Sequence, residues 1–171
     1  MSSDSTFSTK NSTKGFTLVE LIIVMVVMGI VSATAVSRFT NTQSFAARFF
    51  VDDVIAALRY ARTYSYTTGC QIRFSVNNGS RFSVNRPNDC SATQPVFGVI
   101  DKPFSANEPY QISAPTGITL KDKTGDASPD LDFFPNGTAC SASTTRNFVI
   151  TATGISRTIT VECATAYVHE T

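Results

Sequence analysis

Glu20 is the first residue whose type and position suggest a chemical role. It is the only charged residue between Phe16 and Val36, in a segment that is otherwise almost entirely apolar. A carboxylate at the centre of a membrane span costs about 2.5–3.5 kcal/mol even on lenient insertion scales. An unpaired charge in a low-dielectric setting is costly and a paired one much less so, so Glu20 requires a positively charged partner.

The other candidates for chemistry are cysteines and a single histidine. None of the four cysteines lies in a CxxC pair, and His169 is the only histidine, so a zinc site is poorly supported. We expect His169 to be a solvated residue of the tail. The chain has no nucleophile elbow, P-loop or HExxH motif, which predicts a non-enzymatic protein without a metal or other cofactor.

The composition is that of one exported domain with an N-terminal anchor. The chain has 171 residues, of which 42% are hydrophobic and 16% charged. This content is sufficient for a core and too low for a protein that crosses the membrane many times. The formal net charge of +1 argues against bulk electrostatic binding to nucleic acid.

The apolar segment is long enough to cross a membrane, since about 20 residues suffice for a helix. Lys10 and Lys14 precede it, which predicts a cytoplasmic N-terminus and an exported body. A secretory signal peptide cleaved near residues 32–35 is one alternative, but its apolar stretch would normally span about 7–15 residues. A plain single-pass anchor is the other alternative, and it leaves Glu20 unexplained.

Residues 14–20, KGFTLVE, resemble the class III signal of type IV pilins and type II secretion pseudopilins. The resemblance implies that a prepilin peptidase cleaves between Gly15 and Phe16 and methylates the new amino terminus of Phe16. Glu20 then lies about one helical turn from a free amine, on its own chain or on a neighbour, with which it can pair. In this superfamily that pairing guides a subunit into the growing filament. The implied partners are the peptidase, other major and minor pilins and the inner-membrane assembly platform.

A helical pattern continues from Phe39 to Tyr66, and residues 67–69 end it. We expect one long helix whose first half lies in the membrane or filament core and whose second half packs on the body. Its charged residues are expected to form a solvated face. The positions expected to face the body are Ala47, Phe50, Val54, Leu58, Ala61 and Ser65.

Two β-hairpins are predicted beyond the helix. The first pairs Val76 with Phe82 across an Asn-Asn-Gly-Ser turn. The second pairs Ala152 with Ile155 across Thr-Gly. An even number of cysteines in an exported chain predicts two disulfides. The hairpin registers favour the pairs Cys70–Cys90 and Cys140–Cys163, although the sequence leaves the other two connectivities open.

Residues 86–146 connect the hairpins and contain three short predicted strands, at 96–100, 118–120 and 131–134. This region also holds four aspartates, which could form a calcium-binding loop. Their spacing is not that of an EF-hand, so we expect a solvated loop. The four are Asp122, Asp126, Asp130 and Asp132.

Four arginines lie on or beside the hairpins and could contact DNA. They are dispersed along the sequence, the tail at residues 169–171 is not basic, and few aromatic residues lie between them. DNA binding therefore stays an alternative rather than the main interpretation. The four are Arg81, Arg86, Arg146 and Arg157.

The body carries a second resemblance. DFFPNG at residues 132–137, GISR at residues 154–157 and LRYAR at residues 58–62 are similar to motifs of minor pseudopilin H and of FimT-type minor pilins. The resemblance implies an α+β, pilin-like fold, with a long N-terminal helix packed on a small antiparallel sheet. The paired cysteines and the overall proportions resemble minor pilins of the mannose-sensitive haemagglutinin (MSHA) pilus.

These patterns predict a structural minor pilin that assembles into or primes an MSHA-like type IV pilus, with roles in adhesion and pilus biogenesis. A type II secretion minor pseudopilin is the first alternative, and a pilus-tip module that binds DNA is the second. The expected organisation is a cleaved leader at 1–15, a membrane or filament-core helix at 16–37 and an exported domain at 38–171. We expect the chain to sit first in the inner membrane and then in the pilus at the cell surface.

Overall fold

The chain begins with two helices, α1 (Leu18–Phe39) and α2 (Thr42–Thr68). The computed structural model describes residues 15–39, 42–105, 107–140 and 144–171, and it gives the backbone alone for residues 33–39 and 42. The described parts form two units, Met1–Asn41 and Thr42–Thr171. Residues 1–14 of the predicted leader, and the predicted continuity of one helix through residues 40–41, lie outside the described residues.

The face of α2 that packs on the body is the predicted one. All six expected positions are buried, including Ser65, whose side chain is fully buried. The helix ends where the sequence indicates, because Gly69 has a φ of 70° and its N–H donates to the carbonyl of Ser65 at 3.0 Å. The charged residues Asp52, Asp53 and Arg62 lie on the exposed side of α2.

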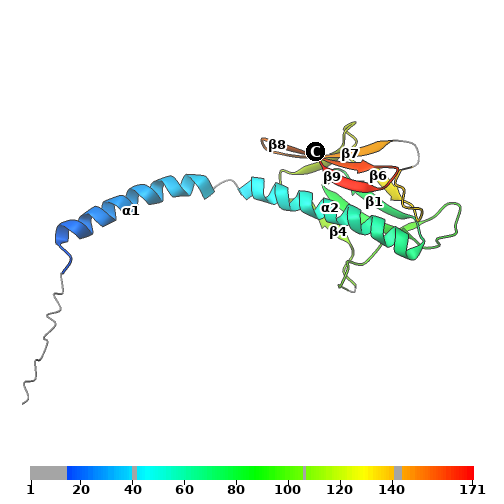
Figure 1. Ribbon diagram of the computed structural model, residues 1–171, viewed down its shortest axis with the longest axis horizontal. Helices are drawn as coiled ribbons and strands as arrows, with labels where there is room; N and C mark the ends of the chain where they lie inside the picture. The colour runs from blue at the N-terminus through cyan, green and yellow to red at the C-terminus, as the bar shows by residue number, and fades with distance from the viewer. Residues whose placement is uncertain (1–14, 40–41, 106, 141–143) are drawn as a thin grey trace, which may run out of the picture. The chain divides into compact units, whose positions relative to one another are not determined.

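Nine antiparallel strands in the described part of the chain form two sheets (Figure 1). The first sheet has the order β3-β2-β1-β6, and β4 also pairs with β2; the second has the order β5-β7-β8-β9. The first sheet contains β1 (Ile72–Asn77), β2 (Arg81–Pro87), β3 (Phe97–Val99), β4 (Gln111–Ser113) and β6 (Asp130–Phe133). The second contains β5 (Thr119–Asp122), β7 (Thr145–Ala152), β8 (Ile155–Glu162) and β9 (Tyr167–Glu170).

Both predicted hairpins are confirmed, with their registers. Val76 pairs with Phe82 between β1 and β2, and Ala152 pairs with Ile155 between β7 and β8. The α+β class is also as predicted, but the expected small sheet is two sheets, and β4 and β9 were not predicted. Both missed strands are short, at three and four residues, so they carry too little periodicity to be recognised.

Helix α2 packs against both sheets and closes a shared core (Figure 1). A chain of buried aromatic rings crosses this core. Phe82 lies 5.8 Å from Phe50 of α2 and 5.3 Å from Phe74, measured between ring centroids. Phe74 in turn meets Phe148 of the second sheet edge to face at 5.6 Å. These contacts join the helix and the two sheets into one folded body.

The turn of the first hairpin also connects the two sheets. Asn78 and Gly79 are the central residues of the turn that the N–H of Ser80 closes on the carbonyl of Asn77 at 3.1 Å, and both have the positive φ that a type I′ turn requires. The carbonyl of Gly79 accepts the N–H of Leu120 from β5 at 2.8 Å. A Cβ atom at Gly79 would lie 3.1 Å from the carbonyl oxygen of Leu120, so this turn requires glycine both for its φ and for its close approach to β5.

Candidate assembly site

Thr17 caps the start of α1. Its Oγ1 accepts a hydrogen bond from the N–H of Glu20 at 3.3 Å, and its carbonyl accepts from Glu20 and Leu21 at 3.1 and 3.2 Å. Thr17 and Glu20 have the T-x-x-E spacing of a capping box, and the carboxylate lies in the first turn, where the helix dipole favours negative charge. Sequence reasoning missed this role of Thr17, although the T-x-x-E spacing is visible in the sequence.

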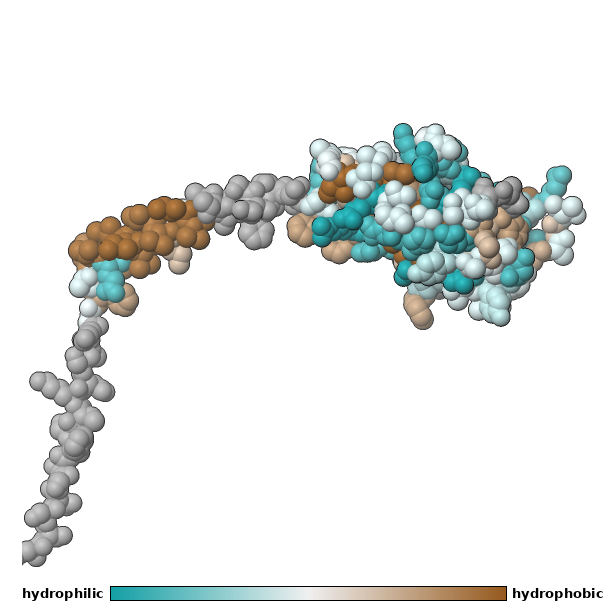
Figure 2. Space-filling model, turned by 45° about the horizontal axis from the view of Figure 1, so that its top comes forward, coloured by the Kyte–Doolittle hydropathy of each residue, from teal (hydrophilic) through white to brown (hydrophobic). Residues whose placement is uncertain are grey.

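The large apolar side chains of α1 are exposed on every side of the helix. Those between Phe16 and Val31 are 48–77% exposed. Figure 2 shows that hydrophobic residues cover most of the visible face of this segment, with a small hydrophilic patch at its start. A helix that is apolar all round is stable when lipid or other helices surround it. Glu20 is exposed in the same segment, and Phe16, four residues before it, is 77% exposed.

In the described part of the chain, none of the helices combines the length and the apolar character needed to cross a membrane.

Two disulfides tie the ends of the hairpins into the body. Cys70 is bonded to Cys90, with their Cα atoms 5.1 Å apart, and Cys140 to Cys163, with their Cα atoms 5.4 Å apart. These are the pairs favoured by the hairpin registers. The N–H of Cys140 also donates to the carbonyl of Asp132 at 2.9 Å, so the second disulfide links the β7–β8 hairpin to β6.

The four aspartates are paired with arginines and turn residues rather than gathered around a cavity. Asp122 is buried at the end of β5 and contacts Arg146 at 3.2 Å, so the prediction of a fully solvated loop is wrong for this residue. Burial alone would raise the pKa of the Asp122 carboxyl, but hydrogen bonds from Thr124 and the charge of Arg146 lower it overall. Among the described residues, no group of three or more His, Cys, Asp or Glu is placed to hold a metal ion.

The four arginines do not form one basic face. Arg81 and Arg86 lie five positions apart on β2, so their side chains leave opposite faces of that strand. Arg146 is paired with Asp122, and Arg157 contacts Glu170 of β9 at 3.1 Å. Two of the four positive charges are therefore neutralised by neighbouring carboxylates. The described part of the body consequently lacks, at these arginines, the cluster of positive charge that is typical of a DNA-binding surface.

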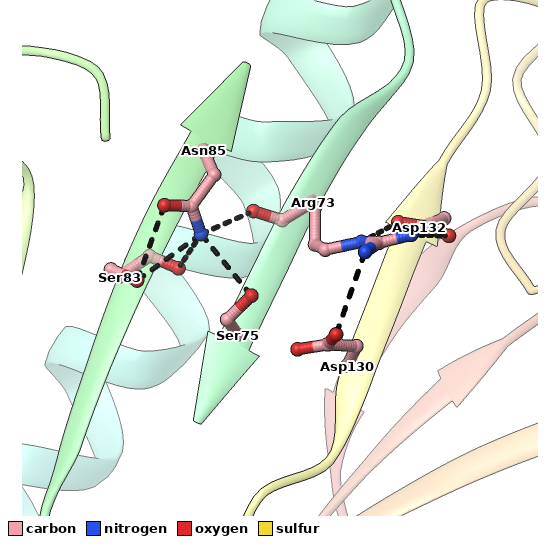
Figure 3. A network of polar contacts seen from close by, with 6 residues as sticks. All are labelled: Arg73, Ser75, Ser83, Asn85, Asp130 and Asp132. Atoms are coloured by element: carbon pink, nitrogen blue, oxygen red, sulfur yellow. Dashed lines mark hydrogen bonds and ion pairs between the residues drawn. The ribbon is translucent and has the colours of Figure 1, made fainter. Parts of the chain in front are cut away.

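A polar network on the first sheet was not predicted (Figure 3). Arg73 of β1 donates two hydrogen bonds to Asp132 of β6, at 2.7 and 2.9 Å, and lies 3.6 Å from Asp130. These hydrogen bonds raise the pKa of Arg73. Its guanidinium also lies 4.1 Å above the ring of Phe97. Asp132, the first residue of the DFFPNG motif, thus holds β6 against β1.

The same network includes a buried asparagine. Asn85 of β2 is 7% exposed, and its amide donates to the carbonyl of Arg73 and to the hydroxyl of Ser75 at 3.3 and 3.2 Å (Figure 3). Its amide also donates to Ser83. A buried amide requires such partners, and here they bridge β1 and β2. No sequence pattern indicates this role, because the partners on β1 are 10 or more residues away.

The sequence suggested that His169 is a solvated tail residue, and this prediction is wrong. It lies in β9, opposite Thr160 of β8, and its ring stacks on Tyr167 at 5.4 Å. Its Nδ1 atom is buried without a hydrogen-bond partner among the described residues. The prediction failed because residues 167–170 add a fourth strand to the second sheet.

Two parts of the chain match known protein families. Residues 10–36 match the prokaryotic N-terminal methylation motif, which places the chain in the superfamily of type IV pilins and type II secretion pseudopilins. Residues 51–165 match the family described as type II transport protein GspH. Because this match covers more than half of the chain, the protein belongs to the GspH family.

The chain is also similar to individual pilus and secretion proteins. It is 50% identical over 48 residues to the type IV narrow pilus major component PilA5 of Thermus thermophilus. That alignment covers 28% of this chain and spans about two fifths of the length of the relative.

Two solved structures show the same fold. The type IV minor pilin FimU of Pseudomonas aeruginosa has a TM-score of 0.50 at 20% identity, over 75% of this chain and 91% of that one. The minor pseudopilin EpsH from the type 2 secretion system of Vibrio cholerae has a TM-score of 0.51 at 12% identity, over 75% and 95%. The predicted pilin-like fold is therefore confirmed. The protein is of a structural, pilin-like type, and the methylation motif implies prepilin processing and contact with other pilins.

Proposed function

We propose that this protein is a minor subunit of a type IV pilus of the MSHA-like kind, where it primes or joins the filament. The observation that carries the proposal is the exposed apolar surface of α1 with Glu20 in its first turn. Each large apolar side chain left in water costs about 1.5–3 kcal/mol relative to a buried one. This surface therefore requires lipid before assembly and neighbouring helices afterwards. The resulting topology has a cytoplasmic N-terminus and a body outside the inner membrane.

Processing between Gly15 and Phe16 provides the positive charge that Glu20 requires. The new amine of Phe16 directly precedes the capping residue Thr17, so it lies within one helical turn of the Glu20 backbone. In the filament core the carboxylate pairs with such an amine on an adjacent subunit, which favours the assembled state over the isolated subunit in lipid. Mass spectrometry of membrane-extracted protein should show a chain that begins at N-methylated Phe16. A chain that begins near Ala35 would indicate ordinary secretion instead.

Substitutions at two positions separate the charge of Glu20 from its capping role. Glu20→Gln keeps a residue suited to the third position of a capping box but removes the charge. We expect Glu20→Gln and Glu20→Ala to insert into the membrane normally and to be depleted from purified filaments. Thr17→Ala is the control, because it removes the cap at a cost of about 1 kcal/mol and leaves the charge. Normal filament incorporation of Glu20→Gln would show that Glu20 acts only as a capping residue.

A type II secretion pseudopilin is the second candidate, and the GspH family match together with the likeness to EpsH favours it. The two functions differ in where the mature subunit is found. Recovery of the mature chain from sheared, purified pili supports the pilus assignment. A deletion strain that keeps its pili but loses type II secretion of exoproteins would support the secretion assignment.

A further inference from the structure

Strand β3 lies at an edge of the first sheet and presents unpaired backbone groups. It pairs with β2, with Gly98 opposite Arg86. The N–H of Ile100 donates to the carbonyl of Val84, and the carbonyl of Val96 accepts from the N–H of Asn88. The backbone hydrogen-bonding groups of Gly98, midway between these two contacts, therefore also face β2, whereas the carbonyl of Ile100 accepts from Tyr110. The N–H and C=O groups of Phe97 and Val99 therefore point away from the sheet. Among the described residues, no backbone hydrogen bond reaches these four groups.

The edge formed by residues 96–100 is apolar and carries no charge. Val96 is 70% exposed and Val99 is 44% exposed. Proteins usually protect such an edge with charged side chains, a bulge or a covering loop, because an exposed apolar edge pairs readily with another strand. The sequence VFGVI at this edge has none of the charged residues that prevent pairing.

A pocket lies beside this edge, on the face of the sheet that α2 covers. It has a volume of about 330 Å³ and is lined by residues that include Tyr64, Arg86, Asn88, Gly98 and Asp101. Gly98 contributes no side chain, and a Cβ atom there would meet only the Asn88 side chain, at 3.5 Å. In a strand added to β3, the residue opposite Gly98 would direct its side chain into this pocket, because paired residues share a face.

The pocket offers both a donor and an acceptor to such a side chain. Neither Arg86 nor Asp101 forms an ion pair with another described residue. A carboxamide can accept a hydrogen bond from Arg86 and donate one to Asp101, whereas a carboxylate would also face the charge of Asp101. A second copy of this chain fits less well, since symmetric pairing about Gly98 would place glycine against glycine and leave both pockets empty.

We propose that β3 accepts an extended segment of a different pilin-type subunit by strand addition, with an Asn or Gln side chain of that segment in the pocket. The outward groups of Phe97 and Val99 bind the backbone of the added strand, and the pocket selects its side chain. This inference rests on the proposed function, because a filament supplies the neighbouring subunit. It assigns the specific contact between unlike subunits to the body rather than to α1.

Two pairs of full-length variants test the contact, with copy number in purified filaments as the readout. Val99→Pro removes one outward N–H at a position where an extended backbone already suits proline. We expect incorporation to fall about fivefold, because losing one hydrogen bond typically changes a binding equilibrium by about that factor. Val99→Ala keeps that N–H and should incorporate normally. Arg86→Glu should also reduce incorporation, whereas Arg81→Glu, on the opposite face of β2, should not. Unchanged thermal unfolding of all four variants would show that the body remains folded.

Photocrosslinking in cells identifies the partner. A photoreactive benzoylphenylalanine in place of Val96 should crosslink, in assembled filaments, to a different subunit that carries an N-terminal methylation motif. Normal incorporation of Val99→Pro, or crosslinks only to a second copy or to a protein of another class, would overturn the inference. If the wild-type chain is itself absent from filaments, the proposed function fails. If the wild type is present and Val99→Pro behaves like it, only the strand-addition inference fails.

Discussion

The Ser65→Ala substitution tests whether a single buried hydroxyl holds the end of α2 on the first sheet. Ser65 is fully buried, and its Oγ lies 2.7 Å from the carbonyl oxygen of Cys70 and 3.0 Å from that of Phe133. Both carbonyls lose this donor in the alanine variant. Leaving a buried acceptor unsatisfied costs about 1–3 kcal/mol, so we expect the free energy of unfolding to fall by that amount.

The assay is urea and thermal unfolding of residues 42–171, which form a separate unit with its own core. A loss of 1 kcal/mol lowers the Tm of a domain of this size by about 4 °C. Thr68→Ala is the matched control, because Thr68 lies on the same helix and its hydroxyl donates to the carbonyl of Tyr64, but it is exposed. We expect Thr68→Ala to change stability by less than about 0.5 kcal/mol. Equal stability of the two variants would refute the role of Ser65.

Three further predictions concern the contacts that hold the sheets together. The pKa of Asp122 is lower in the folded state, so its contribution to stability is present above its ordinary pKa of about 3.9 and is lost as the pH falls through the lower, folded-state value. In urea titrations, the difference in unfolding free energy between wild type and Asp122→Asn should therefore shrink below about pH 4. A difference that is constant with pH would contradict this. The two disulfides close loops of similar length, with separations of 20 and 23 residues. Opening either one, by Cys70→Ser/Cys90→Ser or by Cys140→Ser/Cys163→Ser, should lower the unfolding free energy measured by calorimetry by about 3 kcal/mol. A negligible loss would show that the folded body does not depend on that bridge. Arg73→Ala breaks a partly exposed ion pair, in which the side chains of Arg73 and Asp132 are 29% and 24% exposed, and it removes the contact with Phe97. We expect it to cost only about 1 kcal/mol of unfolding free energy. A loss above about 3 kcal/mol would show that this network behaves as a buried one.

The strongest sequence predictions concerned local patterns. The registers of both hairpins followed from alternating apolar residues around a turn, since pairing fixes which face each side chain occupies. The buried face of α2 followed in the same way from residues three and four apart. Strands β4 and β9 were missed because segments of only three or four residues form a strand only when a neighbouring strand is already in place.

The sequence by itself determined the class of this protein. A carboxylate at Glu20, the preceding Gly15-Phe16 pair and the long apolar run are all local, and together they identify a pilin-type N-terminus. The hairpins are local too, and they favoured the observed cysteine pairs without excluding the other two connectivities. Only the tertiary structure decided how the body is held together and what it exposes. Arg73 meets Asp132 across 59 residues, and Gly79 meets Leu120 of the other sheet, so neither contact has a sequence signature. The free edge of β3 is likewise a property of strand order, which long-range pairing determines after the local elements have formed.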